Sequence, residues 1–233
     1  MLQLSKMSNS LKVSTMTITA QIPKCSEIIL VNVPNQTKNN FKNQVSIKRF
    51  YCNGDSRVSI KIFNSGRLQM TGIRTMNMFV DTYIYVLKLC EDNNVCKLEV
   101  GIKDITPEWL KERGCVKIEM INSNVNCGVK LNLWKVQDVL VNKYKILAMY
   151  KPINYAAVNA KFKAASGKTV SILLFSSGNV MITGSKSYDD LVEADLFRYN
   201  FINENNDIYQ TNNTIPLIKN DTNYNILKNV FIY

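Results

Sequence analysis

An internal repeat constrains this chain more than any other feature. Residues 59–72, SIKIFNSGRLQMTG, align without a gap to residues 171–184, SILLFSSGNVMITG, 112 positions later. Each copy has two apolar runs around a Ser-Gly pair, which is typical of two strands joined by a tight turn. A basic residue, Arg74 or Lys186, follows each copy. A period this long indicates a duplicated domain half, so the sequence predicts two similar halves.

The regions around each copy predict similar elements. In the first half we expect strands at 11–22 and 45–52, a short helix at 26–33, a turn at 53–56, the hairpin 58–72 and a helix at 76–90 capped by Thr75. In the second half we expect strands at 116–125 and 155–163, helices at 133–144 and 187–203, and the hairpin between 171 and 184. The predicted domains are a first repeat at 1–90, a connector at 91–115 with a strand at 96–102 and a short helix after Thr106, a second repeat at 116–207, and a tail at 208–233 with an apolar end.

Composition excludes several classes of protein. Of the 233 residues, 46% are apolar and five are proline, which is typical of a globular protein. We see no apolar run long enough to cross a membrane and no signal-peptide pattern at the start. Six cysteines lack any Cys-x-x-Cys pair and histidine is absent, which argues against zinc and against the commonest general base. We therefore expect neither a metal nor a cofactor, and no enzyme.

The charge is strongly positive and unevenly spread. The formal net charge is +11, and residues 36–75 carry eight Lys and Arg residues against one acid, Asp55. Such a cluster indicates a polyanionic partner, of which nucleic-acid phosphate is the commonest. The alternative is a solvated basic face in a Lys-rich protein.

The two copies together resemble the TATA-box-binding protein family, in which Phe-x-Ser-Gly and Thr-Gly-x-Lys/Arg occur once in each of two repeats. Upstream of the second copy, Tyr150–Val158 (YKPINYAAV) is similar to the family's Tyr-Glu-Pro-Glu-Leu-Phe-Pro-Gly-Leu. The resemblance covers roughly residues 11–90 and 116–204. It implies an α+β fold, a saddle-shaped curved antiparallel sheet of two pseudo-symmetric repeats, with helices on the convex face and the DNA minor groove against the concave face.

Carried over residue by residue, the resemblance implies a DNA-binding surface. The aromatic wedges would be Phe63, Phe175 and Tyr155, with the fourth place held by Asn43, or by Phe41 after a two-residue shift. The groove-facing residues would be Thr71, Thr183, Leu173 and Met181, with Lys61 and Gln69 in apolar places of the first repeat. Asn122 and Asn124 would substitute for central asparagines whose aligned places hold Met120 and Leu11. The basic positions at or beside phosphate would be Arg49, Lys161, Arg67, Arg74 and Lys186. Without the repeat, Phe63 and Phe175 would be ordinary core residues and the basic residues ordinary surface.

The resemblance implies a divergent transcription initiation factor that binds and bends double-stranded, A·T-rich promoter DNA. Its partners would be a transcription factor B-type protein and the RNA polymerase machinery, without a membrane. The Asn- and Lys-rich sequence fits a large DNA virus, so the expected location is the nucleus, a cytoplasmic virus factory or the virion. Two alternatives remain: an interaction scaffold of the same fold that has lost DNA binding, and the accessory substrate-binding half of a nucleic-acid enzyme.

Overall fold

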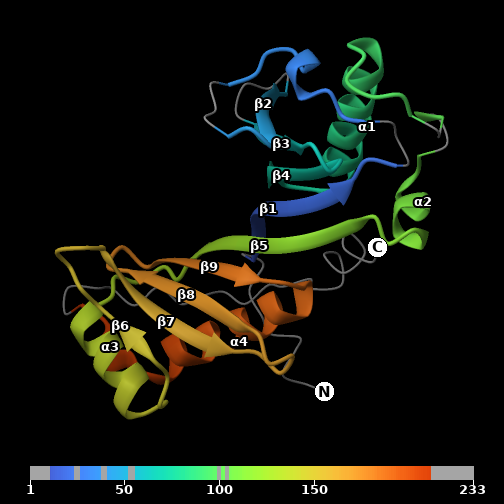
Figure 1. Cartoon of the computed structure of the whole chain (residues 1–233). Coiled ribbons are helices and arrows are strands. Elements are labelled where there is room, and N and C mark those ends of the chain that lie inside the picture. The colour runs from blue at the N-terminus through green and yellow to red at the C-terminus, as the bar shows by residue number, and fades with distance from the viewer. Residues whose placement is uncertain are drawn as a thin grey trace. The chain divides into compact units, whose positions relative to one another are not determined.

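The computed structural model of the chain describes residues 11–23, 27–37, 41–51, 56–98, 101–102 and 105–210. These residues form antiparallel β-sheet and α-helices (Figure 1) and divide into two compact units. We call residues 15–119 the first unit, and residues 120–210 with 11–14 the second unit. The boundary between the units falls within strand β1 (Lys12–Gln21) and within strand β5 (Val116–Asn126).

The first unit is a sheet backed by a long helix. Its strands lie in the order β2-β3-β4-β1, all antiparallel. Their bounds are Gln44–Phe50 for β2, Arg57–Phe63 for β3 and Arg67–Ile73 for β4, and the helices are η2 (Leu30–Asn32), α1 (Met76–Asp92) and α2 (Pro107–Glu112). Phe79 and Tyr83 of α1 are fully buried, as are the alternate β3 residues Val58, Ile60 and Ile62. One face of this sheet therefore forms the core with α1.

The second unit repeats this plan. Its strands lie in the order β5-β9-β8-β7-β6, again antiparallel. The bounds are Leu133–Asn142 for α3, Ala148–Met149 for β6, Ala157–Lys163 for β7, Thr169–Phe175 for β8, Asn179–Ser185 for β9, Tyr188–Glu204 for α4 and Asn206–Ile208 for η4. Helix α4 packs on β8 and β9, and α3 packs on β6 and β7 (Figure 1).

The two copies of the repeat fold alike. Strands β3, β4, β8 and β9 each contain 7 residues, and α1 and α4 each contain 17. Gly66 and Gly178 close the two hairpins at φ of 79° and 84°, in the left-handed region that favours glycine. A Cβ on Gly178 would lie 2.0 Å from the Val129 carbonyl oxygen, so this turn also needs glycine for space. The glycine of the shared Ser-Gly pair is thus required by the backbone.

Both long helices start as predicted. The hydroxyl of Thr75 accepts a hydrogen bond from the Met78 N–H, and that of Ser187 accepts one from the Asp190 N–H, each at 3.1 Å. Such caps satisfy backbone donors that have no partner within the helix.

The prediction of a helix at 26–33 was wrong. In place of the helix predicted at 26–33, residues 27–33 contain only the three-residue η2, because Val33 is extended, as a residue before proline prefers, and Ile29 N–H bonds to the Val95 carbonyl oxygen. Of the strand predicted at 96–102, residues 99–100 lie outside the described residues, and Leu98 forms a single β-bridge. Residues 52–55 and 211–233, which hold most of the predicted turn and tail, lie outside the described residues. The tail was predicted from residue 208, but Ile208 is buried and Gln210 N–H bonds to the Lys130 carbonyl oxygen.

A buried ion pair lies within α4. Arg198 donates from Nε and Nη2 to one carboxylate oxygen of Asp195, and the two residues are 4% and 1% exposed. The Sγ of Cys127 lies 4.0 Å from Arg198 Nη1, and burial raises the pKa of this thiol. The pair holds a polar stretch of α4 inside the second unit, where an unpaired charge would be costly.

Candidate nucleic-acid interface

Each sheet has one face packed on a helix and one face turned away from it, which we call the open face. In the second unit, Ile172 and Leu174 of β8 and Ile182 of β9 are buried against α4. Because successive side chains of a strand point to opposite faces, Leu173 and Met181 lie on the open face.

Two apolar residues lie side by side at the middle of the second unit's open face. Leu173 and Met181 are cross-strand partners, Asn124 pairs with Met181 from β5, and Asn159 pairs with Leu173 from β7. Leu173 is 8% exposed and Met181 is half-buried. Asn124 is exposed at the side of this apolar pair.

An aromatic pair stands at one end of the same face. The rings of Tyr155 and Phe175 meet edge to face, with centroids 6.0 Å apart and planes 62° apart. Phe175 ends β8 opposite Ala157, and the Gly178 N–H bonds to its carbonyl oxygen at 3.0 Å, which closes the hairpin turn beside it. Tyr155 precedes β7 and is 48% exposed. Two predicted wedge residues are therefore in contact.

Polar groups line the other end. Thr183 Oγ1 donates to Asn122 Oδ1 over 2.6 Å, and Lys161 Nζ donates to Ser171 Oγ over 2.7 Å. Ser171 pairs with both Thr183 and Lys161 across the strands, so these side chains form one cluster. Lys186 is exposed just beyond β9, where its backbone N–H donates to Asp190.

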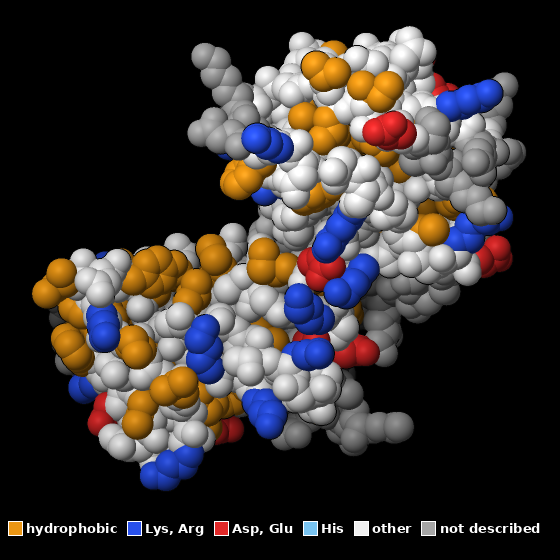
Figure 2. Space-filling model, viewed as in Figure 1, with side chains coloured by type: hydrophobic (Ala, Val, Ile, Leu, Met, Phe, Trp, Pro, Cys, Tyr) orange, Lys and Arg blue, Asp and Glu red, His pale blue; other side chains and the backbone are white. Residues whose placement is uncertain are grey.

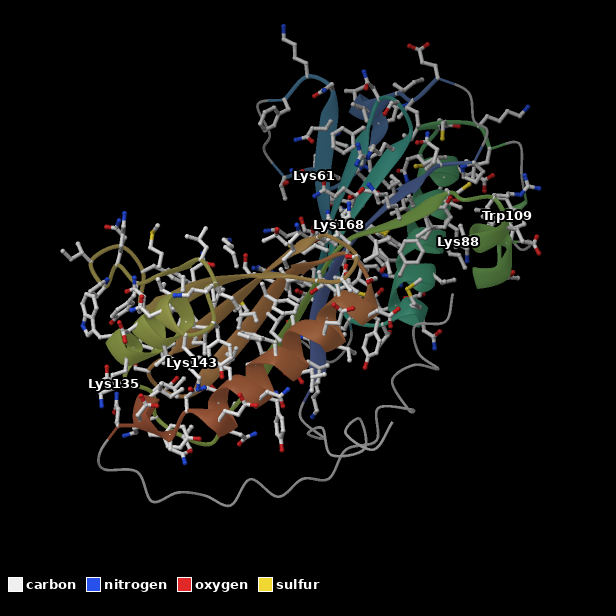
Figure 3. The ribbon with its side chains drawn as sticks, turned by 90° about the horizontal axis from the view of Figure 1, so that it is seen from below. Lys61, Lys88, Trp109, Lys135, Lys143 and Lys168 are labelled. Atoms are coloured by element: carbon white, nitrogen blue, oxygen red, sulfur yellow. The ribbon has the colours of Figure 1, made fainter. Side chains whose placement is uncertain are left out.

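The first unit has a polar open face. Lys61 and Gln69 are cross-strand partners at the places that Leu173 and Met181 take in the second unit. Figure 3 labels Lys61 on β3. Thr71 is exposed and pairs with Thr17, whose hydroxyl donates to it over 3.4 Å.

The remaining first-unit candidates differ in their surroundings. Phe63 is half-buried at the end of β3, opposite Gln44, and Phe41 is 65% exposed in the preceding loop. Arg67 lies 3.6 Å from Glu119, which also accepts from Thr19. Arg74 is exposed just before the Thr75 cap.

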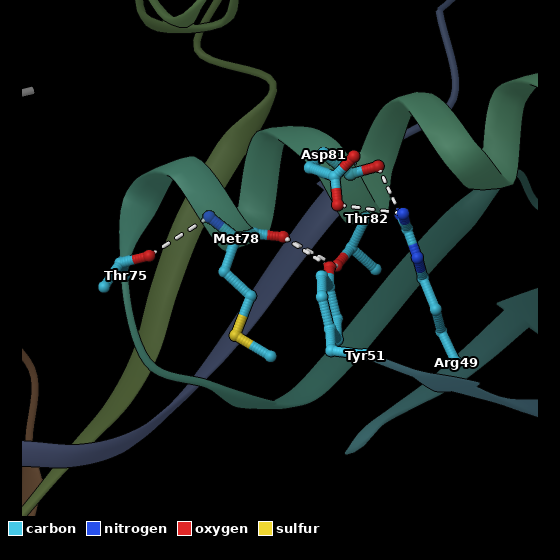
Figure 4. Close-up of polar contacts among 6 residues, drawn as sticks. All are labelled: Arg49, Tyr51, Thr75, Met78, Asp81 and Thr82. Carbon is cyan, nitrogen blue, oxygen red and sulfur yellow. Dashed lines mark hydrogen bonds and ion pairs between the residues drawn. The ribbon is translucent and has the colours of Figure 1, made fainter. Parts of the chain in front are cut away.

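Arg49 lies on the helix-packed face, which corrects its predicted place beside the phosphates. Its Nη2 lies 2.8 Å from the Asp81 carboxylate of α1, and its Nη1 donates to the Asp81 carbonyl oxygen (Figure 4). Its guanidinium also stacks over the rings of Tyr51 and Tyr85. These contacts join β2 to α1, so we leave Arg49 out of the candidate interface.

Two asparagines on the second unit's open face were not among the predicted site residues. Asn126 and Asn179 are cross-strand partners joined by a side-chain hydrogen bond, and both are exposed. With Asn124, Phe175 and Met181 they line a depression of about 470 Å³. Asparagine at alternate positions of β5 was the available signal, but the pairing of Asn126 with Asn179 depends on strand register.

Exposed apolar side chains also gather around β6. Leu147, Met149 and Ile153 are 70%, 50% and 98% exposed, and Trp134 of α3 is 62% exposed. The Trp134 ring meets the edge of Tyr150 at a centroid distance of 4.9 Å. Figure 2 shows hydrophobic side chains interspersed with Lys and Arg on this unit. Clustered exposed apolar residues are typical of interaction sites.

Two features of the described residues bear on other functions. No group of three or more Cys, Asp or Glu side chains in this part of the chain is placed to hold a metal ion. No helix in the same part is long and apolar enough to cross a membrane.

Comparisons with known proteins agree with the fold. Residues 115–204 match the family model described as "Transcription factor TFIID (or TATA-binding protein, TBP)". The chain is 28% identical over 216 residues to the TATA-box-binding protein-like protein of Acanthamoeba polyphaga mimivirus, covering 86% of this chain but only 58% of that protein. It is also 28% identical over 204 residues to the TATA-box-binding protein of Pyrococcus abyssi, covering 84% of this chain and 95% of that protein.

A solved structure extends this similarity to three dimensions. The chain superposes on Methanococcus jannaschii TBP with a TM-score of 0.62 and 20% identity, covering 84% of this chain and 99% of that one. The predicted α+β fold of two antiparallel repeats is thereby confirmed.

Proposed function

The chain is a divergent member of the TATA-box-binding protein family, and from this premise we propose that it binds A·T-rich promoter DNA through the minor groove and bends it. The observation that carries the proposal is the Tyr155–Phe175 pair beside the apolar Leu173 and Met181. The minor groove offers few groups that distinguish base pairs, and apolar wedges enter it by partly unstacking a base step, as TATA-box-binding proteins do. We infer that Phe175 and Tyr155 act as this wedge.

We propose a different role for the first unit. Lys61 and Gln69 replace apolar residues on its open face, and burying a lysine against base edges is costly unless its charge is paired. We infer that Lys61, Arg67 and Arg74 act mainly on the phosphates, with Phe63 as a weaker wedge. The net charge of +11 supports such a role.

The remaining candidates keep supporting roles in this proposal. Thr71 and Thr183 would face the groove, Asn122 and Asn124 would donate to base edges, and Lys161 and Lys186 would contact phosphates. Phe41 is retained as the alternative first-unit wedge because it is exposed in the loop before β2.

The proposed partners follow from family membership. We infer that the chain recruits a transcription factor B-type protein and RNA polymerase, in a nucleus, virus factory or virion, and that it performs no catalysis. The exposed apolar cluster around Trp134 and Ile153 would serve protein contact. If Ile153→Asp no longer captures the transcription factor B-type protein but keeps its DNA affinity, this result would support the site.

Fluorescence anisotropy tests the central proposal. Labelled duplexes of equal length, one A·T-rich and one G·C-rich, are titrated with the full chain at physiological salt. We expect tighter binding to the A·T-rich duplex and a bend detected by energy transfer between its labelled ends. Equal, weak binding to both duplexes would instead favour a scaffold that has lost DNA recognition.

A further inference from the structure

Two hydrogen-bonded asparagines stand beside Phe175 on the open face of the second unit. Asn126 Nδ2 donates to Asn179 Oδ1 over 2.5 Å, across the β5–β9 pair. The backbone N–H of Gly128 donates to Asn126 Oδ1 over 2.7 Å. The three groups therefore form a chain of hydrogen bonds that runs in one direction.

This chain fixes how both side-chain amides point. A backbone N–H can only donate, so the Asn126 atom that it meets must be the oxygen. The amino group of Asn126 then donates to Asn179, and the Asn179 atom that accepts must be its side-chain oxygen. The amino group of Asn179 remains, and within the described part of the chain it has no protein acceptor. Asn179 is thus held as a hydrogen-bond donor.

The Asn179 amino group lies beside Phe175, where the edge of a base would lie if Phe175 entered a base step. Asn179 and Phe175 line the same depression of about 470 Å³, together with Asn124 and Met181. Asn179 itself is exposed at the start of β9, directly after the hairpin turn. A group entering beside the Phe175 ring would therefore meet this amide.

Minor-groove chemistry selects among base pairs at such a donor. A·T and T·A pairs present only acceptors there, adenine N3 and thymine O2, whereas a G·C pair adds the guanine N2 amino donor. A fixed amino group matches the first pattern and opposes the second. A side-chain amide that could rotate freely would instead accommodate both A·T and G·C pairs.

We propose that Asn179 reads one A·T pair at the base step beside the Phe175 wedge, with Asn126 and Gly128 as the positioning groups. The inference rests on the proposed minor-groove function and adds a specificity-determining residue to it. The base pair read by Asn179 would lie in the half of the DNA site that contacts the second unit.

Modified bases isolate the contact. In an A·T-rich duplex, single A·T pairs are replaced one at a time by 2,6-diaminopurine·T, which adds a minor-groove amino group, or by inosine·C, which changes the pair without adding one. At one position we expect diaminopurine·T to weaken binding by the wild-type chain roughly 3- to 10-fold, which corresponds to the loss of one hydrogen bond. Inosine·C at the same position should leave binding unchanged. Asn179→Leu should lose this penalty at that position alone. The matched control is Asn200→Leu, an exposed asparagine on α4, which should behave as wild type.

A second variant tests the orientation. In Asn126→Asp the carboxylate can only accept, so it takes the Gly128 N–H and also an N–H of Asn179, which turns the Asn179 oxygen outward. The added negative charge should weaken binding to every duplex. The ratio of affinities for diaminopurine·T and A·T at the Asn179 position should nevertheless reverse in favour of diaminopurine.

The outcomes separate the inference from the proposed function. If the wild type prefers A·T-rich DNA but Asn179→Leu keeps the penalty at every position, the assignment of Asn179 is wrong and minor-groove binding stands. If Asn126→Asp leaves the ratio unchanged, the oriented amide is wrong. If the wild type does not bind duplex DNA, both the inference and the proposed function fail.

Discussion

Phe63 and Phe175 hold matching places in the repeat, but their neighbours differ. Phe175 meets Tyr155 edge to face and lies near Met181, in the same depression. Phe63 ends β3 opposite Gln44, and no aromatic contact joins it to Phe41 among the described residues. A wedge supported by a second ring loses less freedom when it enters DNA, because its rotamer is already restricted.

We therefore expect the two phenylalanines to contribute unequally to bending. Phe175→Ala should abolish the bend measured by energy transfer between labelled DNA ends and should lower the A·T preference, while Phe63→Ala should retain most of both. Equal losses in the two variants would show that the halves deform DNA alike. If neither variant loses bending, the assignment of Phe63 and Phe175 as wedges is wrong.

Two arginines of the first unit provide a contrast in charge effects. Arg67 has a 56% exposed side chain at its long contact with Glu119, whereas Arg49 is held by Asp81 and two tyrosine rings. Arg67→Ala should weaken binding to all sequences alike and reduce the log–log salt slope by about one. Arg49→Ala is the control, since it should lower the melting temperature and leave the slope unchanged. A smaller slope in Arg49→Ala would return that residue to the interface.

The resemblance, more than any local pattern, indicated which hairpin residues face away from the helices. Alternation is regular in β3 but not in β8, where Ile172, Leu173 and Leu174 are all apolar and buried. The resemblance misplaced Arg49, since it identified a basic position without fixing which face of β2 that position occupies. It also missed Asn126 and Asn179. Their pairing depends on the β5–β9 register, which shifts between Ile121 and Ser123, and no local pattern encodes such a shift.

At the scale of elements, capping decided where the long helices begin, and both starts were predictable from Thr75 and Ser187. The helix predicted at 26–33 failed because apolar spacing alone cannot outweigh the conformational preference before Pro34 and the bond from Ile29 to Val95. Strand β6 was missed because two residues are too few to show a pattern.

The start of α4 makes second-unit stability depend on pH. Asp190 is 2% exposed; burial favours a higher pKa, but hydrogen bonds from Ser166, Ser187 and the Lys186 backbone outweigh it, so the pKa of this carboxyl lies below its usual value. Such a group stabilises the folded state above its unfolded pKa, about 3.9, and that contribution is lost as pH falls through the folded pKa.

Asp190→Asn should therefore lower the melting temperature at pH 7 and reduce its decline below about pH 4. Thermal unfolding followed by circular dichroism across this range measures both effects. Asp189→Asn changes an exposed neighbour in the same helical turn and should alter stability much less. Equal declines for wild type and Asp190→Asn would contradict this account.

At the scale of the whole molecule, the net charge is +11, summed over many Lys and Arg residues. Binding that neutralises several phosphates should weaken steeply with salt, with a log–log slope of about −0.9 for each phosphate contact. Affinity for an A·T-rich duplex, measured by anisotropy between low and physiological salt, gives this slope. A flat response would indicate that the basic residues serve solubility and not DNA.

The unequal open faces give the molecule a polarity. A protein with two identical halves would bind even an asymmetric A·T-rich site equally well in either orientation, and nothing would then mark upstream from downstream. Here one half presents Lys61 and Gln69 where the other presents Leu173 and Met181. When both halves contact one duplex, turning the protein around exchanges a charged contact for an apolar one. We infer that a directional promoter needs only slightly different half-sites to set the direction of transcription.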